Sequence, residues 1–329
     1  MTNWEFRDIL PSVIHMQNKI VGRFAPSPSG RLHLGNMLSS LLAWLDVRSL
    51  GGQMLFRLED LDPDRSFKHY ADLMAEDLLW LGLDWDEGWR PDSGSEYAQG
   101  NRTALYEAAL QQLENMGLLY PCYCSRAQRL AASAPHPGEL REGGCGCRAM
   151  SEANRRLMEK NRRYPATKVH VPDAEISFPD GHYGPQLFSF RAGRDDFIVR
   201  RADRVFAYQL AVSYDDAAMG VTRVVRARDL MDSTPKQIWL MKQFGYAPLT
   251  YAHGPLLVAG EGRKMSKRDG DLNMEALRAR NTPEELCGKL AYLAGLLPEP
   301  VPIKAVDLIP LFSWDKVKKE DIPLPDDLF

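Results

Sequence analysis

Residues 23–36 read RFAPSPSGRLHLGN, and this stretch decides the fold. The residues from Ile20 to Ala25 predict a β-strand. Pro26 and Pro28 end that strand, because a proline has no N–H for the ladder and a fixed φ. Residues 37–45 then read MLSSLLAWL, in which the apolar side chains have helical spacing. The stretch therefore predicts a strand, a tight turn and a helix.

His33 and Asn36 lie at the predicted start of that helix. A helix N-terminus collects unpaired N–H groups and the positive end of the helix dipole, which suits a polyphosphate. Gly30 and Gly35 let the backbone approach a ligand closely, and a histidine here can donate to an oxygen that gains charge in a transition state. The prediction is a nucleotide site, and the alternative is an ordinary turn between a strand and a helix.

A second motif lies far along the chain, where residues 262–270 read GRKMSKRDG. Lys264 and Lys267 carry compact charges on flexible stems that can follow a phosphate through a reaction. Alone, this pattern is also typical of a solvated loop. Because this motif follows the first one along the chain, however, the two together resemble those of the class I aminoacyl-tRNA synthetases. The two nucleotide motifs of that class are named HIGH (here HLGN from His33) and KMSKS (here KMSKR from Lys264).

The resemblance implies how these two motifs work. His33 is expected to donate to the α- and β-phosphates of ATP, Lys267 to hold the leaving pyrophosphate, and Lys264 to support it. Gly35 and Asn36 complete the expected ATP site. Mg²⁺ is expected with ATP, where it shares the phosphate charge.

Other segments are similar to the glutamyl branch of that class: RFAPSP from residue 23, RLEDLD from 57, YQLAV from 208, the acidic pair 215–216, and VVRARDL from 224. Together they extend over residues 20–270. The resemblance implies a glutamate site in which arginines bind the carboxylates, one acidic side chain binds the α-ammonium group, a hydroxyl orients the substrate, and small residues form the floor. The expected residues are, in that order, Arg23 and Arg226, Glu59, Tyr208, and Ala25 with Ser27.

Some of these roles have alternatives in the sequence. Arg226 could instead form a structural ion pair with Asp229 or Asp232. The other carboxylates of residues 57–62 compete with Glu59 to face the ligand. The acidic pair 215–216 is compatible with a metal or acid–base role, or with capping and loop hydrogen bonds.

Four of the five cysteines form two Cys-x-Cys pairs separated by twenty residues: Cys122, Cys124, Cys145 and Cys147. Four thiolates in this spacing predict a structural, tetrahedral Zn²⁺ site, because no ligand position is left open for chemistry. Related synthetases carry zinc at this place with a variable second ligand pair, so His136 could replace one thiolate. The other reading is free buried cysteines, and the fifth, Cys287, is expected in the core.

The remaining pattern predicts an α/β fold, namely a doubly wound parallel sheet of the Rossmann type with a zinc-bearing α+β insertion and a short helical C-terminal segment. Strands are predicted at 53–58, within 168–199, at 208–214 and at 222–226. Helices are predicted at 64–81, 96–116, 151–160, 235–244 and 283–297. The predicted units are an extension (1–18), a first catalytic half (19–118), the insertion (119–195), a second catalytic half (196–260) and a C-terminal segment with the KMSKR motif (261–329).

Composition sets further limits. In 329 residues, 41 Lys and Arg stand against 44 Asp and Glu, for a net charge of −3, so bulk charge does not indicate nucleic-acid binding. The sequence has neither an apolar run of about 18 residues nor a signal-peptide pattern. We expect a cytoplasmic monomer that has no membrane contact.

Sixty-two residues follow Lys267, too few for the anticodon domain that longer glutamyl synthetases carry. The resemblance therefore favours a truncated subgroup, which activates L-glutamate with ATP without needing RNA and transfers it to queuosine in the anticodon of tRNA(Asp). An unpaired loop base suits such recognition. The alternatives are a glutamyl-tRNA synthetase that charges the tRNA 3′ end, which resembles its relatives in needing tRNA for activation, and a non-catalytic zinc-containing tRNA-binding paralogue.

Overall fold

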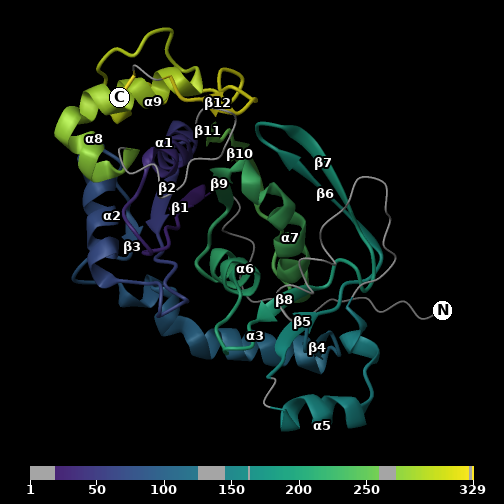
Figure 1. Cartoon of the computed structure of the whole chain (residues 1–329). Helices are drawn as coiled ribbons and strands as arrows, with labels where there is room; N and C mark the ends of the chain where they lie inside the picture. Colours follow the sequence, from purple (N-terminus) through teal and green to yellow (C-terminus); the bar gives the residue numbers. More distant parts are fainter. Residues whose placement is uncertain (1–18, 125–144, 162–163, 259–271, 326–327) are drawn as a thin grey trace.

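A computed structural model describes residues 19–124, 145–161, 164–258, 272–325 and 328–329 (Figure 1). Its centre is formed by two sets of parallel strands. The first set has the order β1-β2-β3 and the second contains β10 next to β9. Their bounds are β1 Val21–Phe24, β2 Gln53–Phe56, β3 Glu87–Gly88, β9 Arg223–Ala227 and β10 Thr250–Gly254.

The two sets meet where β1 lies beside β9. Thr222 N donates to Val21 O over 2.9 Å, and the Arg23 side chain donates to Val225 O over 3.1 Å. The first and last parts of the catalytic unit, about 200 residues apart in sequence, thus form one parallel α/β layer. The predicted doubly wound α/β fold is confirmed.

Helix α1 (Leu34–Ser49) packs across this layer and contacts β1, β2 and β9. Ten of its residues are buried, from Leu34 to Val47, so the helix is apolar on nearly every side. Gly22 on β1 makes the close approach possible, because a Cβ there would come within 2.3 Å of Val47 Cγ2. The predicted strand, turn and helix at the head of the chain are confirmed.

The middle of the chain forms two antiparallel structures. Strands β4, β5 and β8 make a small sheet that lies apart from the central layer, beside α5, while β6 and β7 form a long hairpin (Figure 1). β6 pairs with β10 at Asp180 and Tyr251, so this hairpin also borders the central sheet. The bounds are β4 Leu119–Cys122, β5 Ala166–Val169, β6 Ala174–Asp180, β7 Gly184–Phe190 and β8 Phe197–Arg200.

The described part of the chain contains seven further helices, of which α5 lies beside the small antiparallel sheet (Figure 1). They are α2 Lys68–Trp80, α3 Thr103–Asn115, α5 Glu152–Lys160, α6 Tyr208–Ala218, α7 Thr234–Gln243, α8 Met274–Arg280 and α9 Pro283–Ala294. Helix α9 begins with a capping box between Thr282 and Glu285 and packs its apolar face, including Cys287, into the same core as α1. A short parallel pair, β11 (Leu257–Val258) with β12 (Ile322–Pro323), joins the C-terminal segment to this core.

Two predicted elements differ from the structure. Residues 208–214 were expected as a strand, but they begin helix α6, in which the Ser213 hydroxyl donates back to Gln209 O. The helix expected from residue 96 begins at Thr103, because two 3₁₀ turns, Ser95–Tyr97 and Gln99–Arg102, precede it. Within the described ranges, every helix is too short or too polar to span a bilayer.

Candidate active site

A cleft of about 510 Å³ opens where β1 and β9 end and α1 begins. This is the edge of an open parallel sheet at which ligands bind. Nine residues that the sequence predicts for the glutamate and ATP sites line it together: Arg23, Ala25, Ser27, His33, Gly35, Asn36, Glu59, Tyr208 and Arg226. Lys264 and Lys267 lie outside the described residues.

The first turn of α1 holds His33 in a fixed orientation. His33 is the N-cap: its Nδ1 accepts from Asn36 N over 3.4 Å, while Asn36 Oδ1 accepts from His33 N over 3.1 Å. Because Nδ1 accepts, the neutral ring carries its proton on Nε2, as inferred from the partners. Gly35 lies against the ring, where a Cβ would come within 3.2 Å of His33 Cε1. The helix start thus presents a donor beside unpaired backbone N–H groups.

On one side of the cleft, buried charges form a chain from Arg23 to Glu59. Asp216 accepts from Arg23 Nε over 3.3 Å and from Arg57 Nη1 over 2.5 Å, and Arg57 Nη2 donates to Glu59 Oε1 over 3.0 Å. The side chains of Arg57 and Asp216 are almost completely buried. Burial raises the pKa of Asp216, but the charges of Arg57 and Arg23 lower it by more, so the pKa lies below its usual value. Burial raises the pKa of Glu59 against the lowering by Arg57.

Arg226 is bound very differently. Its guanidinium donates to four neutral groups: Gln237 Oε1 (2.8 Å), Thr234 Oγ1 (2.7 Å), His253 Nε2 (3.2 Å) and the Tyr208 hydroxyl (3.4 Å). The residue is 6% exposed. In the described part of the chain no carboxylate lies within ion-pair distance of it, so the predicted alternative, a structural salt bridge with Asp229 or Asp232, is not formed. A buried cation without an anionic partner is costly, and an anionic ligand would relieve that cost.

A hydrogen-bonded pair, His253 and Asp180, holds the Arg226 side chain in position. His253 Nδ1 donates to Asp180 Oδ2 over 2.6 Å, which leaves Nε2 as the acceptor for Arg226 Nε. Burial lowers the pKa of His253, the bond to Asp180 opposes this, and the charge of Arg226 lowers the pKa further. The ring therefore stays neutral, as an acceptor for Arg226 must.

Sequence reasoning missed these supporting residues. Arg57 follows β2, Thr234 and Gln237 lie on α7, and His253 lies on β10, so their contacts depend on how these elements pack with β9. The acidic pair is resolved in favour of structural hydrogen bonds and ion pairs. Asp215 accepts from Gln99, Arg102 and Tyr106, and Asp216 from the two arginines named above. In the sequence, the signal that could have indicated these supporting residues is the acidic pair 215–216 near a motif arginine.

Comparison with known proteins agrees with this geometry. Residues 19–301 match the family described as "tRNA synthetases class I (E and Q), catalytic domain". The chain is a class I tRNA synthetase of this group. The enzyme is therefore a ligase, and the sequence resemblance to the glutamyl branch is confirmed.

This synthetase is similar to proteins with two different names. It is 47% identical to a "Glutamyl-Q tRNA(Asp) synthetase" of Symbiobacterium thermophilum, over 93% of this chain and 96% of the relative, and 44% identical to one of Nitratidesulfovibrio vulgaris, over 94% and 97%. A "Glutamate--tRNA ligase" of a Synechococcus strain is 36% identical over 90% of this chain and 62% of its own length.

Among solved structures, the synthetase is similar to a glutamate tRNA ligase of Elizabethkingia meningosepticum, crystallised in complex with its amino acid. The TM-score is 0.76 at 22% identity, over 94% of this chain and 68% of that one. At this identity, the likeness confirms the fold.

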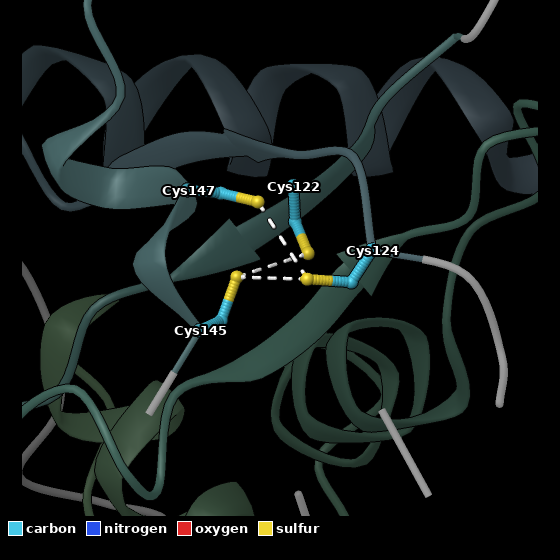
Figure 2. Close-up of side chains that lie close together, drawn as sticks. All are labelled: Cys122, Cys124, Cys145 and Cys147. Carbon is cyan, nitrogen blue, oxygen red and sulfur yellow. Dashed lines mark hydrogen bonds between the residues drawn. The ribbon is translucent and has the colours of Figure 1, made fainter. Parts of the chain in front are cut away.

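The synthetase also brings its two cysteine pairs together (Figure 2). All four Sγ atoms lie within 4.8 Å of one another, with Cys145 Sγ 3.4 Å from Cys122 Sγ and from Cys124 Sγ, and Cys124 Sγ 3.6 Å from Cys147 Sγ. These separations exclude disulfides, whose sulfurs lie about 2.05 Å apart. Zinc at about 2.3 Å from each thiolate would place the sulfurs about 3.8 Å apart in a tetrahedron. The cluster fits Zn²⁺ with four cysteines, and His136 lies outside the described residues.

Proposed function

We propose that this synthetase activates L-glutamate with ATP and transfers the glutamyl group to queuosine in the anticodon of tRNA(Asp). In the first step a glutamate carboxylate oxygen attacks the α-phosphorus, and the bond to the β-phosphate breaks to release pyrophosphate. In the second, a hydroxyl of the RNA base attacks the activated carbonyl, and AMP leaves. No protein nucleophile is needed.

The observation that carries the first step is the buried Arg226 with four neutral partners. A carboxylate of the amino acid would supply the missing anion and accept from the fifth guanidinium N–H, which the four bonds above do not use. Arg23 offers a second cation in the same cleft, and its Nε and Nη1 are already oriented by Asp216 and Val225 O. Two cations suit a substrate with two carboxylates.

The remaining cleft residues complete the proposed roles. Glu59 binds the α-ammonium group, because it lines the cleft and lies close enough to Arg23 for that charge to lower its pKa. The Tyr208 hydroxyl orients the substrate next to Arg226, over a floor formed by Ala25 and Ser27. We propose that the four-cysteine cluster holds a structural Zn²⁺, which cross-links β4 to the segment around Cys147.

For ATP, His33 donates from Nε2 to the phosphates at the start of α1, where Gly35 and Asn36 leave the backbone open to them. Lys264 and Lys267 remain predicted to hold the phosphates and the pyrophosphate. Mg²⁺ bound with ATP would neutralise part of the phosphate charge.

The choice of queuosine as acceptor is supported by the relatives. Those named glutamyl-Q tRNA(Asp) synthetase are 47% and 44% identical and match over almost their whole length, whereas the glutamate–tRNA ligase is 36% identical and matches over 62% of its length.

Glutamate-dependent exchange of pyrophosphate into ATP, measured without RNA, tests this proposal first. Exchange without RNA, followed by glutamate incorporation into queuosine-containing tRNA(Asp) and not into the unmodified tRNA, is the expected result. Exchange that appears only with tRNA(Glu), with charging of its 3′ end, would contradict the queuosine assignment. Lys267→Ala should abolish exchange while glutamate still binds, and full exchange in that variant would contradict its role.

A further inference from the structure

A second hollow, of about 410 Å³, lies directly behind the active-site cleft. Two short segments form the wall between them. Residues 26–28 and 57–60 are joined by a backbone hydrogen bond from Glu59 N to Pro26 O over 2.9 Å. Glu59 lines the cleft, whereas Leu58 and Asp60 line the second hollow. Side chains alternate in this way in an extended chain, so one wall supplies both sites.

Part of the lining of the second hollow is aromatic and apolar, and it includes Trp89 and Phe67. Trp89 packs against Phe56 with ring centroids 5.6 Å apart and is 7% exposed, so its position is fixed. Phe67, at the N-cap of α2, is 46% exposed, and its N–H is bound to Pro28 O. An exposed aromatic ring among the residues that line a hollow is a platform for a planar ligand.

The charged residues that line the hollow are two carboxylates, Asp60 and Asp92, and two cations, Lys68 and Arg90. Asp60 Oδ1 accepts from Gly100 N over 2.7 Å, which holds the side chain. A carboxylate has about four acceptor sites, and three backbone N–H groups interact with Asp60, so one acceptor site remains for a ligand N–H. Burial raises the pKa of Asp60, and the backbone N–H groups of Gly100, Asp60 and Gln99 oppose the rise. Lys68 and Arg90 also line the hollow and are exposed.

We propose that this hollow binds the unstacked purine-type base of the RNA acceptor, with Asp60 accepting from the base's amidine edge and Phe67 stacking on its face. Lys68 and Arg90 contact the neighbouring phosphates. This inference rests on the proposed function. A guanine-type base presents a ring N–H and an exocyclic amino group side by side, and the carboxylate accepts from one of them. Queuosine is a 7-deazaguanine whose hydroxyl-bearing ring hangs on a short arm.

That chemistry explains why the base site and the reaction site are separate. With the base held behind the wall of residues 57–60, the arm reaches over the wall to bring a hydroxyl to the activated glutamate. When a tRNA 3′ end is charged, the reactive hydroxyl belongs to the ribose of the nucleotide itself, so that reaction needs no base pocket behind the wall of residues 57–60.

The test compares transfer to queuosine-containing tRNA(Asp) with RNA-free pyrophosphate exchange in the same enzyme preparations. Phe67→Ala and Asp60→Asn should each lower the ratio of the transfer rate to the exchange rate at least tenfold, and Phe67→Trp should restore most of it. Asparagine keeps an oxygen for Gly100 N but places an amino group against the donors of the base. Leu79→Ala, an exposed apolar residue at the other end of α2, is the matched control and should keep the wild-type ratio.

The outcomes separate the two proposals. If the wild-type enzyme performs exchange and transfer but Phe67→Ala and Asp60→Asn keep the wild-type ratio, the base pocket is wrong and the proposed function stands. If the wild-type enzyme exchanges pyrophosphate but glutamylates only a tRNA 3′ end, the proposed acceptor is wrong and the pocket falls with it. Binding of a fluorescent anticodon stem–loop of tRNA(Asp) should weaken in Phe67→Ala at least tenfold, and equal binding would again overturn the pocket.

Discussion

Replacing Asp216 by alanine should destabilise the synthetase more than any surface change. The carboxylate is 1% exposed and lies between Arg23 and Arg57, which are 6% and 0% exposed. Its removal leaves two buried guanidinium groups with less compensation. The variant should also bind glutamate more weakly, because Asp216 orients Arg23 in the cleft.

The size of the effect follows from these contacts. Breaking a buried ion pair by removing one partner costs about 3–5 kcal/mol. Arg57 keeps its bond to Glu59, which limits the loss, so we expect about 3 kcal/mol for Asp216→Ala. The comparison is Asp72→Asn, which breaks the exposed pair with Lys68 within α2 and should cost about 0.3–0.5 kcal/mol.

Urea unfolding followed by tryptophan fluorescence and circular dichroism measures both free energies of unfolding. The folded-state pKa of Asp216 lies below its unfolded value, which is about 3.9. Its stabilisation is therefore present above about pH 4 and is lost as the pH falls through the folded-state pKa. The difference between wild type and Asp216→Ala should be constant from about pH 5 to 8 and shrink in acid. Equal free energies of unfolding for wild type and Asp216→Ala at pH 7 would refute the reasoning.

Three further changes test other parts of the structure. Cys145→Ser should lose the zinc that we propose for the four-cysteine cluster, as measured by native mass spectrometry, and the sheet of β4, β5 and β8 should then melt before the central sheet. Cys287→Ala should keep the metal, and retained zinc in Cys145→Ser would contradict the four-cysteine site. His253→Leu removes the acceptor for Arg226 Nε. Because a hydrogen bond to a charged group contributes about 1.5–3 kcal/mol, this variant should raise KM for glutamate about 10- to 100-fold. His253→Gln should recover part of the lost affinity for glutamate, and an unchanged KM in both variants would exclude a positioning role for His253. Thr282→Ala removes the capping box of α9 and should cost about 1 kcal/mol in thermal unfolding, whereas Thr282→Ser should cost far less.

The head of the chain could be predicted because its signals are local. Two prolines, a glycine-rich turn and an apolar helix act within 20 residues, and β1, the turn and α1 follow. Residues 208–214 show where local signals fail. YQLAVSY contains aromatic and β-branched residues typical of strands, yet a short apolar run does not distinguish a strand from a buried helix. The packing of α6 against α7 and α3 decides for the helix.

The candidate site shows the same division. Arg23, His33 and Arg226 could be predicted because each belongs to a sequence motif. Arg57 reaches Asp216 across 159 positions and His253 reaches Asp180 across 73, and no periodicity encodes such contacts. The 3₁₀ turn before α3 contains a similar contact, in which Asp60 accepts from Gly100 N across 40 positions.

The alternation of side chains along residues 57–60 has an evolutionary consequence. Inserting or deleting one residue between β2 and Asp60 would turn Glu59 away from the cleft and bring a neighbour into its place. A point substitution along this segment changes one side chain, whereas a change of length reorients every side chain between it and Asp60. We therefore expect descendants of this enzyme to diversify by exchanging residue types at 58 and 60, at constant spacing, and to accommodate insertions only beyond Asp62.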